Sequence, residues 1–210
     1  MAMATEVKME IWHRIDSRAI KCKIMSVQKP PNQIRNARDY EILYMRKLEQ
    51  FCQHENHGKV WDELNIVINS AGGSAESAIG LLGALHRCRK MKKMKTRILI
   101  DGMCGRAATY IACGMGKKVP VYITPGSKYF IHNPKTEVFH RRRGGIWESF
   151  FKAGSKQLTR DMVNMYHSRT KVSKKVIRQW MNEGKYFTAE EAVKVGFVDR
   201  VLSAHDFYWW

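Results

Sequence analysis

Two segments of this chain share one order of features, and that order limits the fold more than any other part of the sequence. Residues 64–69 form a short, mostly apolar run that breaks into a Gly-Gly turn and then a helical pattern. Residues 98–100 form a second such run, followed by the turn-forming residues 101–105 and another apolar helical segment. Short apolar runs of this kind indicate strands buried on both faces. Their alternation with helices predicts right-handed crossovers and an α/β fold with a mainly parallel sheet.

The N-terminal part of the chain has weaker patterns. Residues 9–16 and 19–27 show partial apolar alternation, which predicts a β-hairpin or edge strands. Residues 36–54 carry apolar side chains at near-helical spacing and predict an amphipathic helix. We expect a single domain overall, in which residues 1–62 supply N-terminal strands and a helix and residues 63–210 form the core.

The C-terminal part is predicted to be mostly helical. A long amphipathic helix is expected over residues 147–170, and Ser173 is placed to cap a shorter helix after it. Thr188 and Glu191 have the spacing of a capping box, which predicts a further helix that ends before a final strand. The aromatic tail, residues 207–210, is expected to dock on its own subunit or on a neighbouring one.

Composition restricts the partners and the compartment. A chain of 210 residues suits one well-filled core, and its net charge of +18 favours acidic partners, of which nucleic acid is one. No apolar run approaches the roughly 20 residues that span a bilayer, so no membrane partner is expected. The cysteines form no C-x-x-C pair, which favours an intracellular, reducing compartment over a disulfide framework or a zinc site. There are five cysteines, Cys22, Cys52, Cys88, Cys104 and Cys113.

Three sequence blocks carry a family resemblance. Residues 69–74 read N-S-A-G-G-S, residues 131–134 read I-H-N-P, and residues 187–192 read F-T-A-E-E-A, followed by G-F-V-D at 196–199. In this order and spacing they resemble the ClpP family of self-compartmentalising serine peptidases, with alanine where the family has proline in the first block. The likeness covers residues 65–202 and is greatest to ClpP-related proteins of bacteriophages, with bacterial and plastid relatives as alternatives.

The resemblance implies a fold, partners and a location. The fold would be a ClpP-like or crotonase-like spiral of ββα units, with the long helix over residues 147–170 protruding from it. Family members stack as two heptameric rings through that helix, so the partners would be further copies of the chain or an active ClpP-like paralogue, together with an AAA+ unfoldase. The location would be a bacterial or phage-infected cytoplasm or the plastid stroma. No cofactor and no metal are expected.

A peptidase of this kind needs a hydroxyl nucleophile, a histidine base, a carboxylate that orients the histidine, and N–H donors for the oxyanion. The resemblance places His132 at the base and Gly73 at one oxyanion donor. Aligning the family's D-G-M-x-x-S with residues 101–106 puts Arg106 at the nucleophile position. The second oxyanion donor would then be Ala107, the residue after it.

Other assignments of the catalytic residues remain open. A second alignment, on G-x-A-A-S, puts Thr109 at the nucleophile position but shortens the following helix by about a turn. The carboxylate should stand four residues before Thr188, where the chain has Gly184, and the neighbouring Glu183 could replace it only in a shifted loop. Cys104, next to the turn, is a further candidate nucleophile, although cysteines at buried turns are more often structural.

Three functions follow from these assignments. A guanidinium cannot attack a carbonyl, so the preferred prediction is a ClpP-like ring subunit that has lost peptidase activity and plays a structural or regulatory role. The first alternative is an active endopeptidase that uses a non-standard nucleophile such as Thr109 with His132. The second is a basic scaffold that binds nucleic acid, suggested by the net charge and by the basic residues 90–95 and 141–143.

Overall fold

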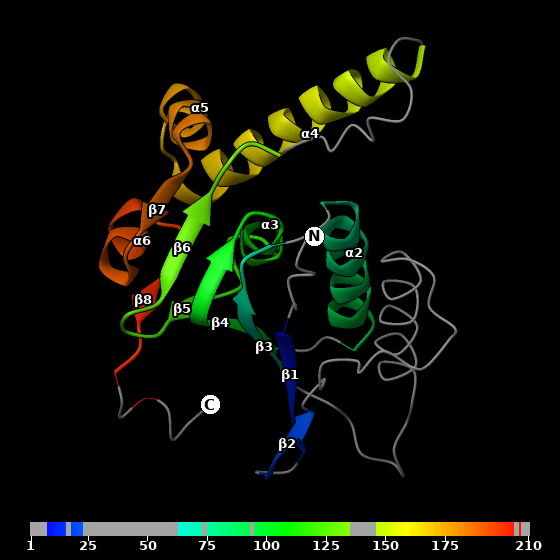
Figure 1. The fold of residues 1–210 in the computed structure, drawn as a ribbon. Helices are drawn as coiled ribbons and strands as arrows, with labels where there is room; N and C mark the ends of the chain where they lie inside the picture. Colours follow the sequence, from blue (N-terminus) through cyan, green and yellow to red (C-terminus); the bar gives the residue numbers. More distant parts are fainter. Residues whose placement is uncertain are drawn as a thin grey trace, which may run out of the picture.

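A computed structural model of the chain describes residues 8–15, 18–22, 63–72, 75–92, 95–134, 146–203 and 206. These residues form a mixed α/β structure around one sheet (Figure 1). The strands are β1 (Lys8–Ile15), β2 (Arg18–Cys22), β3 (Glu63–Ser70), β4 (Lys95–Gly105), β5 (Val121–Ile123), β6 (Lys128–Ile131), β7 (Lys185–Phe187) and β8 (Arg200–Val201). The helices are α2 (Ala75–Lys92), α3 (Ala107–Gly114), α4 (Ile146–Thr170), α5 (Lys174–Glu183) and α6 (Ala189–Val195).

The sheet has the strand order β2-β1-β3-β4-β5-β8, with β6 paired to β4 and β7 paired to β6. The pairs β3–β4, β4–β5, β4–β6 and β5–β8 are parallel, which confirms the predicted mainly parallel sheet. β1 pairs antiparallel with both β2 and β3, so the N-terminal strands form the predicted hairpin and extend the same sheet. The predicted helix over residues 36–54 lies outside the described residues.

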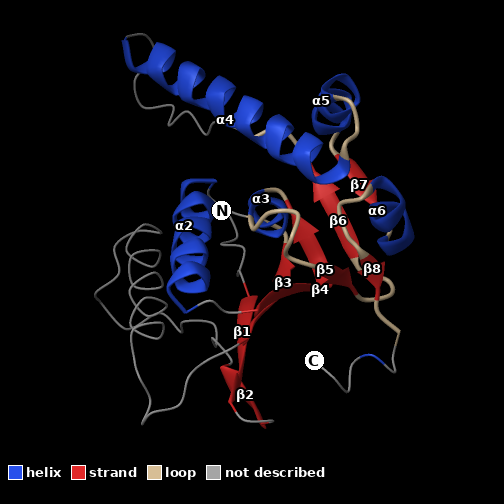
Figure 2. Cartoon of the chain, turned by 180° about the vertical axis from the view of Figure 1, so that it is seen from behind, coloured by secondary structure: helices blue, strands red, loops and turns tan. Residues whose placement is uncertain are grey.

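The core lies between the sheet and the helices packed against it. The apolar run of β3 supplies Leu64, Ile66 and Ile68, of which none is more than 3% exposed. Helix α3 packs between α2 and α4, and α4 in turn contacts α5. Figures 1 and 2 show that α4 extends well beyond the edge of the sheet, as expected for the long helix over residues 147–170. In the described part of the chain, no helix is long and apolar enough to cross a membrane.

The predicted bounds of one strand, β4, were wrong. The strand expected over residues 98–100 runs from Lys95 to Gly105, because Met103, Cys104 and Gly105 pair through their backbone with β6. Backbone pairing of this kind leaves no apolar pattern in the sequence.

The helix ends follow their predicted capping residues. The Ser173 side chain accepts a hydrogen bond from the backbone N–H of Val176 at the start of α5. At the start of α6, Thr188 and Glu191 make both bonds of the capping box, since each side chain accepts from the other residue's backbone N–H. Both predictions are confirmed, whereas the aromatic tail at residues 207–210 lies outside the described residues.

Candidate functional site

The candidate site is built on the turn between β4 and α3, where Arg106 has φ 50° and ψ −117°. This conformation is close to the first central position of a type II′ turn, which glycine usually occupies. A residue with a side chain held there costs about 1–3 kcal/mol. Two backbone hydrogen bonds hold it: the Arg106 N–H donates to the Phe130 carbonyl at 3.0 Å, and the Arg106 carbonyl accepts from Thr109 N–H at 3.0 Å. Sharp turns between a strand and a helix present their side chain at the end of a sheet.

The loop after β3 packs directly against this turn. A Cβ atom added to Gly72, which has φ 108°, would lie 2.6 Å from the Arg106 Cβ and 2.8 Å from the Gly105 carbonyl oxygen. It would also lie 3.1 Å from the Ala107 nitrogen, so only glycine permits this approach. The two Gly-containing turns predicted from the sequence therefore touch. Gly73, the other predicted oxyanion residue, lies outside the described residues.

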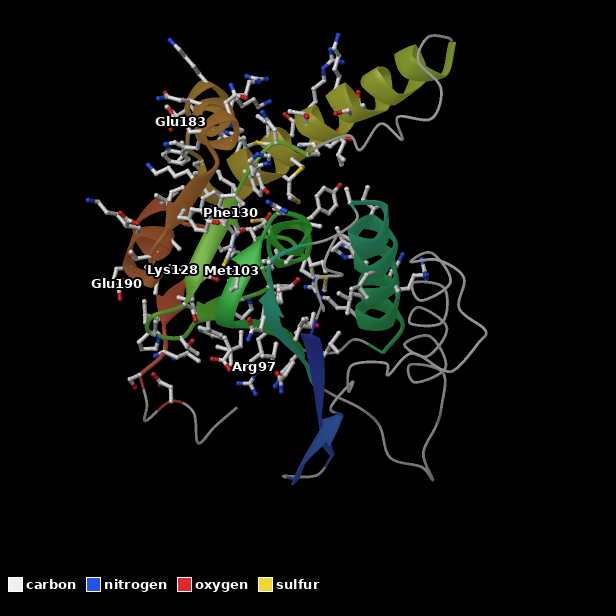
Figure 3. All side chains as sticks on the ribbon, in the orientation of Figure 1. Arg97, Met103, Lys128, Phe130, Glu183 and Glu190 are labelled. Carbon is white, nitrogen blue, oxygen red and sulfur yellow. The ribbon has the colours of Figure 1, made fainter. Side chains whose placement is uncertain are left out.

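The Arg106 side chain is exposed at the mouth of the turn. Its guanidinium carbon lies 5.9 Å from the centroid of the Phe130 ring, which is within the range of a cation–π contact. Phe130 itself is 6% exposed and lies on β6 (Figure 3). Among the described residues, the ion pairs of the structure do not include Arg106. The guanidinium therefore presents its N–H donors to solvent.

His132 and Gly184 come together at the end of the β6–β7 pair. The register pairs Ile131 with Lys185, so His132 and Gly184 follow next on the two chains. A Cβ added to Gly184 would lie 3.2 Å from the Cδ2 atom of the His132 ring. The His132 ring is half-buried and stacks on the Phe130 ring with centroids 6.0 Å apart. The position expected for the orienting carboxylate thus lies beside the imidazole, and it carries no side chain.

Glu183, the neighbouring carboxylate, is engaged within its own helix. Its Oε1 accepts a hydrogen bond from Gln179 Nε2 at 2.9 Å, and its side chain is exposed at the end of α5 (Figure 3). The chain after His132 is tied to the same helix end. Asn133 donates through its backbone N–H to the Met181 carbonyl at 3.0 Å and through Nδ2 to Asn182 Oδ1.

The hydroxyl of Thr109 lies in the interior of the molecule. Thr109 is 0% exposed, and its Oγ1 donates to the Arg106 carbonyl at 2.5 Å. Because that bond uses its only proton, the Tyr166 hydroxyl, also 2.5 Å away, must donate to Thr109. Burial raises the pKa of Tyr166 well above its ordinary value. The pair joins α3 to α4 and has no access to a substrate from solvent.

Cys104 is equally enclosed. It is 0% exposed, and burial raises the pKa of its thiol well above the ordinary 9.0, with a smaller contribution from Cys113. With this raised pKa, the thiol of Cys104 stays protonated at neutral pH. Because only a thiolate is an effective nucleophile, Cys104 is not one in the folded protein. Near Cys104 lies Cys113, whose sulfur is 3.1 Å from the Tyr129 hydroxyl.

Two aromatic residues of the site were not identified from the sequence. Phe130 and Tyr186 are paired across β6 and β7, and their rings stack with centroids 4.1 Å apart. Tyr186 is 58% exposed, so it forms an open apolar surface beside the turn. The sequence holds a partial signal for Phe130, because the alternation of β6 places it on the same face as His132. It holds no signal for Tyr186, because Tyr186 reaches the site through the pairing of β6 with β7, more than fifty residues away.

The described residues contain no group of three or more His, Cys, Asp and Glu side chains arranged to hold a metal ion. The groups that the structure brings together at the turn are a guanidinium, an imidazole and two stacked aromatic rings. Arg106, His132 and Gly184 lie around Phe130, whereas Thr109 and Cys104 lie in the core beneath the turn.

Comparison with known proteins bears on both the family and the fold. A family model described as Clp protease matches residues 18–205, nearly the whole chain. Among solved structures, the chain is similar to a ClpP1 mutant from Listeria monocytogenes, with a TM-score of 0.61 and 18% sequence identity. The match covers 80% of this chain and 86% of that one. At 18% identity, the match to this structure shows that the two folds are alike and no more than that.

Proposed function

Because this chain belongs to the Clp protease family, we propose that it is a proteolytic-core subunit without peptidase activity of its own. The family is one of serine peptidases whose members form stacked rings and pair with AAA+ unfoldases. The observation that carries the proposal is the pairing of two replacements: Arg106 at the strained turn and Gly184 beside His132. Each removes a different chemical part of the same mechanism.

The first replacement removes the nucleophile. A serine or threonine attacks because a neighbouring base accepts its proton. A guanidinium is a delocalised cation without a lone pair available for attack on a carbonyl, so Arg106 cannot take the place of the hydroxyl. The turn holds its backbone in a conformation suited to presenting a side chain, and the side chain it presents cannot react.

The second replacement removes the group that orients the base. Without a carboxylate beside it, an imidazole is free to adopt the wrong tautomer and rotation, and loss of that carboxylate alone can lower kcat by about 10⁴-fold. Gly184 leaves this position without a side chain, and Glu183 is bound to Gln179. Substituting either position alone is therefore expected to restore little activity.

The alternative nucleophiles support the same proposal. Thr109 is buried and hydrogen-bonded to Tyr166, and Cys104 is buried with a raised pKa. A substrate could reach either group only if α3 separated from the core. Of the three functions predicted from the sequence, the inactive ring subunit agrees best with this geometry. Its partners would be further copies of itself or an active paralogue, and an AAA+ unfoldase.

The direct test is labelling of the purified protein with a fluorophosphonate probe, read by intact mass, alongside turnover of unfolded casein. We expect no adduct and no turnover from a protein that sediments as an oligomer. A stoichiometric adduct on Thr109 would overturn the proposal in favour of an active peptidase. Loss of that adduct in Thr109→Val would locate the nucleophile.

A second test restores the missing groups. We expect the double variant Arg106→Ser with Gly184→Asp to react with the probe at position 106, and to react at least about 100-fold faster than either single variant. Aspartate is among the residues that best tolerate the positive φ of 69° at position 184. A folded double variant that stays unlabelled would show that His132 is not positioned as a base.

A further inference from the structure

The vacated site has an unusual balance of charge. Arg106 is a cation, His132 is a second basic group, and the position between β6 and β7 that would hold a carboxylate is Gly184. Glu190, on α6, lies at the periphery of the molecule in Figure 3. Six further carboxylates of the described residues are bound elsewhere: Asp101 with Thr124, Asp161 with Gln157, Glu183 with Gln179, Glu191 with Thr188, Asp199 with Arg169, and Asp206 with Ser203.

We propose that this site binds a carboxylate group of a peptide, with the Arg106 guanidinium as its principal ligand. The proposal rests on the proposed function, since a working nucleophile at this turn would leave no role for the arginine. The carboxylate has two sources, a free peptide C-terminus and an acidic side chain. Both present the same two oxygens to the guanidinium.

The chemistry of the guanidinium favours this ligand. Its N–H groups form a planar fork that matches the two oxygens of a carboxylate, and bonds of this kind are about twice as strong as neutral ones. The Phe130 ring beneath Arg106 and the close packing of Gly72 against its Cβ restrict the positions the side chain can take. A restricted donor loses less conformational entropy when it binds. The exposed N–H groups are the part of Arg106 that a ligand can reach.

The aromatic surface beside Arg106 favours a peptide over a free anion. Tyr186 is 58% exposed and stacks on Phe130, so an apolar side chain next to the bound carboxylate would find apolar surface. Guanidinium groups also bind phosphate. A free phosphate ion would not use this surface, so we favour a peptide, and the phosphoserine peptide in the test below separates its phosphate from a carboxylate.

The backbone at position 106 gives an independent argument. A residue other than glycine is strained at φ 50°, and strained residues cluster at ligand clamps and active sites. Glycine would relieve the strain, so the side chain of Arg106 is present despite a cost to stability. Among the described residues, its side chain contacts the Phe130 ring face at 5.9 Å and lies against Gly72 at its Cβ, while its guanidinium forms no ion pair.

Fluorescence anisotropy with three labelled peptides of one apolar sequence tests the proposal. The first has a free C-terminus, the second is amidated, and the third is amidated but carries an internal glutamate. We expect the amidated peptide to bind at least about tenfold more weakly than the free one, a difference of about 1.4 kcal/mol. If the third peptide also binds, the acidic side chain is a source of the carboxylate; if it does not, the terminus is.

Two variants provide the matched comparison. In Arg106→Gln we expect the free and amidated peptides to bind equally, because the fork is lost while the turn is kept. Arg178→Gln removes one charge from an exposed arginine on α5 and should leave the tenfold difference unchanged. Equal binding of all peptides to the wild-type protein, or equal losses in the two variants, would overturn the proposal. So would tighter binding of an amidated phosphoserine peptide.

The same samples separate this inference from the proposed function. After each titration the peptides are analysed by mass spectrometry. Intact peptides with no preference for a carboxylate contradict the binding site alone and leave the inactive subunit in place. Cleaved peptides contradict the proposed function, whatever their affinity.

Discussion

Position 106 combines a backbone conformation that favours glycine with a large side chain. The backbone conformation, φ 50° and ψ −117°, favours glycine, whereas the side chain is one of the largest available. The turn is fixed on both sides, by the hydrogen bond to the Phe130 carbonyl and by the contact with Gly72. The surrounding structure therefore imposes the conformation on whichever residue occupies the position.

This strain should be measurable. We expect Arg106→Gly to raise the free energy of unfolding by about 1 kcal/mol, which is the relief of strain less the greater entropy of a glycine in the unfolded chain. For a chain of this length that gain corresponds to a rise in Tm of about 2–4 °C. Differential scanning calorimetry measures it, and a lower Tm would show that the Phe130 contact outweighs the strain.

Lys171 offers a control. It is the only other residue besides glycine with positive φ in the described structure, at 63°, and it follows α4 where glycine is the commonest residue. Lys171→Gly should give a similar stabilisation. Unlike Arg106→Gly, it should leave the binding of a carboxylate peptide unchanged.

The buried thiols predict a loss of stability at alkaline pH. Burial raises the pKa of Cys113 from 9.0 to about 11 and raises the pKa of Cys104 well above 9.0. Below about pH 9 both thiols are protonated in the folded and the unfolded chain, so neither contributes a pH dependence. Between about 9 and 11 the unfolded chain loses these protons first, and the free energy of unfolding should fall by roughly 1 kcal/mol per pH unit for each thiol.

Urea unfolding at a series of pH values from about 8 to 10.5 tests this. Lysines titrate in the same range, so the informative quantity is the difference between the wild-type protein and Cys113→Ala. The variant should be less stable at pH 8 and should lose stability less steeply above pH 9. Parallel curves would mean that solvent reaches the thiol in the folded protein.

Among the secondary-structure elements, Arg169 near the end of α4 connects three segments. Its side chain is 2% exposed and forms an ion pair with Asp199, which lies between α6 and β8. The same guanidinium donates to the carbonyls of Phe197 at 3.3 Å and Val119 at 3.2 Å. It therefore fixes α4 to the loop before β5 and to the turn after α6.

We expect Arg169→Met to lower the free energy of unfolding by about 3 kcal/mol, because it leaves buried carbonyls and a partly buried carboxylate without their donor. Arg178→Met, on the exposed face of α5, should change it by no more than about 0.5 kcal/mol. Urea denaturation monitored by circular dichroism compares the two variants. A loss below about 1 kcal/mol for Arg169→Met would mean that water replaces the lost donor.

The elements that could be predicted from the sequence are those with local signals. The caps at Ser173 and Thr188 depend on contacts within three residues, and β3 is marked by a short apolar run whose Leu64, Ile66 and Ile68 are buried. The extension of β4 to Gly105 depends on β6, which follows more than twenty residues later. Local patterns hold no information about such pairing.

The same distinction applies to the site. The sequence predicts that Arg106, His132 and Gly184 share one site because each stands at a fixed distance from a family motif, and in the structure all three lie around Phe130. The stack of Phe130 on Tyr186 could not, because it depends on how β6 and β7 pair. Whether Thr109 was available as a nucleophile also required the structure, since its partner, Tyr166, lies on another helix.

For the whole molecule, the net charge of +18 has a consequence for assembly. In the ring assembly proposed above, copies of the chain would repel one another, and salt screens that repulsion over about 10 Å at 0.1 M. We therefore expect assemblies larger than the 24.4 kDa monomer to become more stable as salt rises from about 0.05 to 0.5 M. Sedimentation velocity across that range is the measurement. Dissociation as salt rises would indicate that ion pairs hold the subunits together.

The strained turn also affects how position 106 can vary. In a saturation library screened only for folded protein, glycine, asparagine and aspartate should outcompete the other residues, because they best tolerate positive φ. Arginine would be depleted in such a screen. In a second screen of the same library, in which survival of the host cell depends on the function of the protein, arginine should be retained. The difference in the frequency of arginine between the two screens would measure selection for the function of Arg106 separately from selection for the fold.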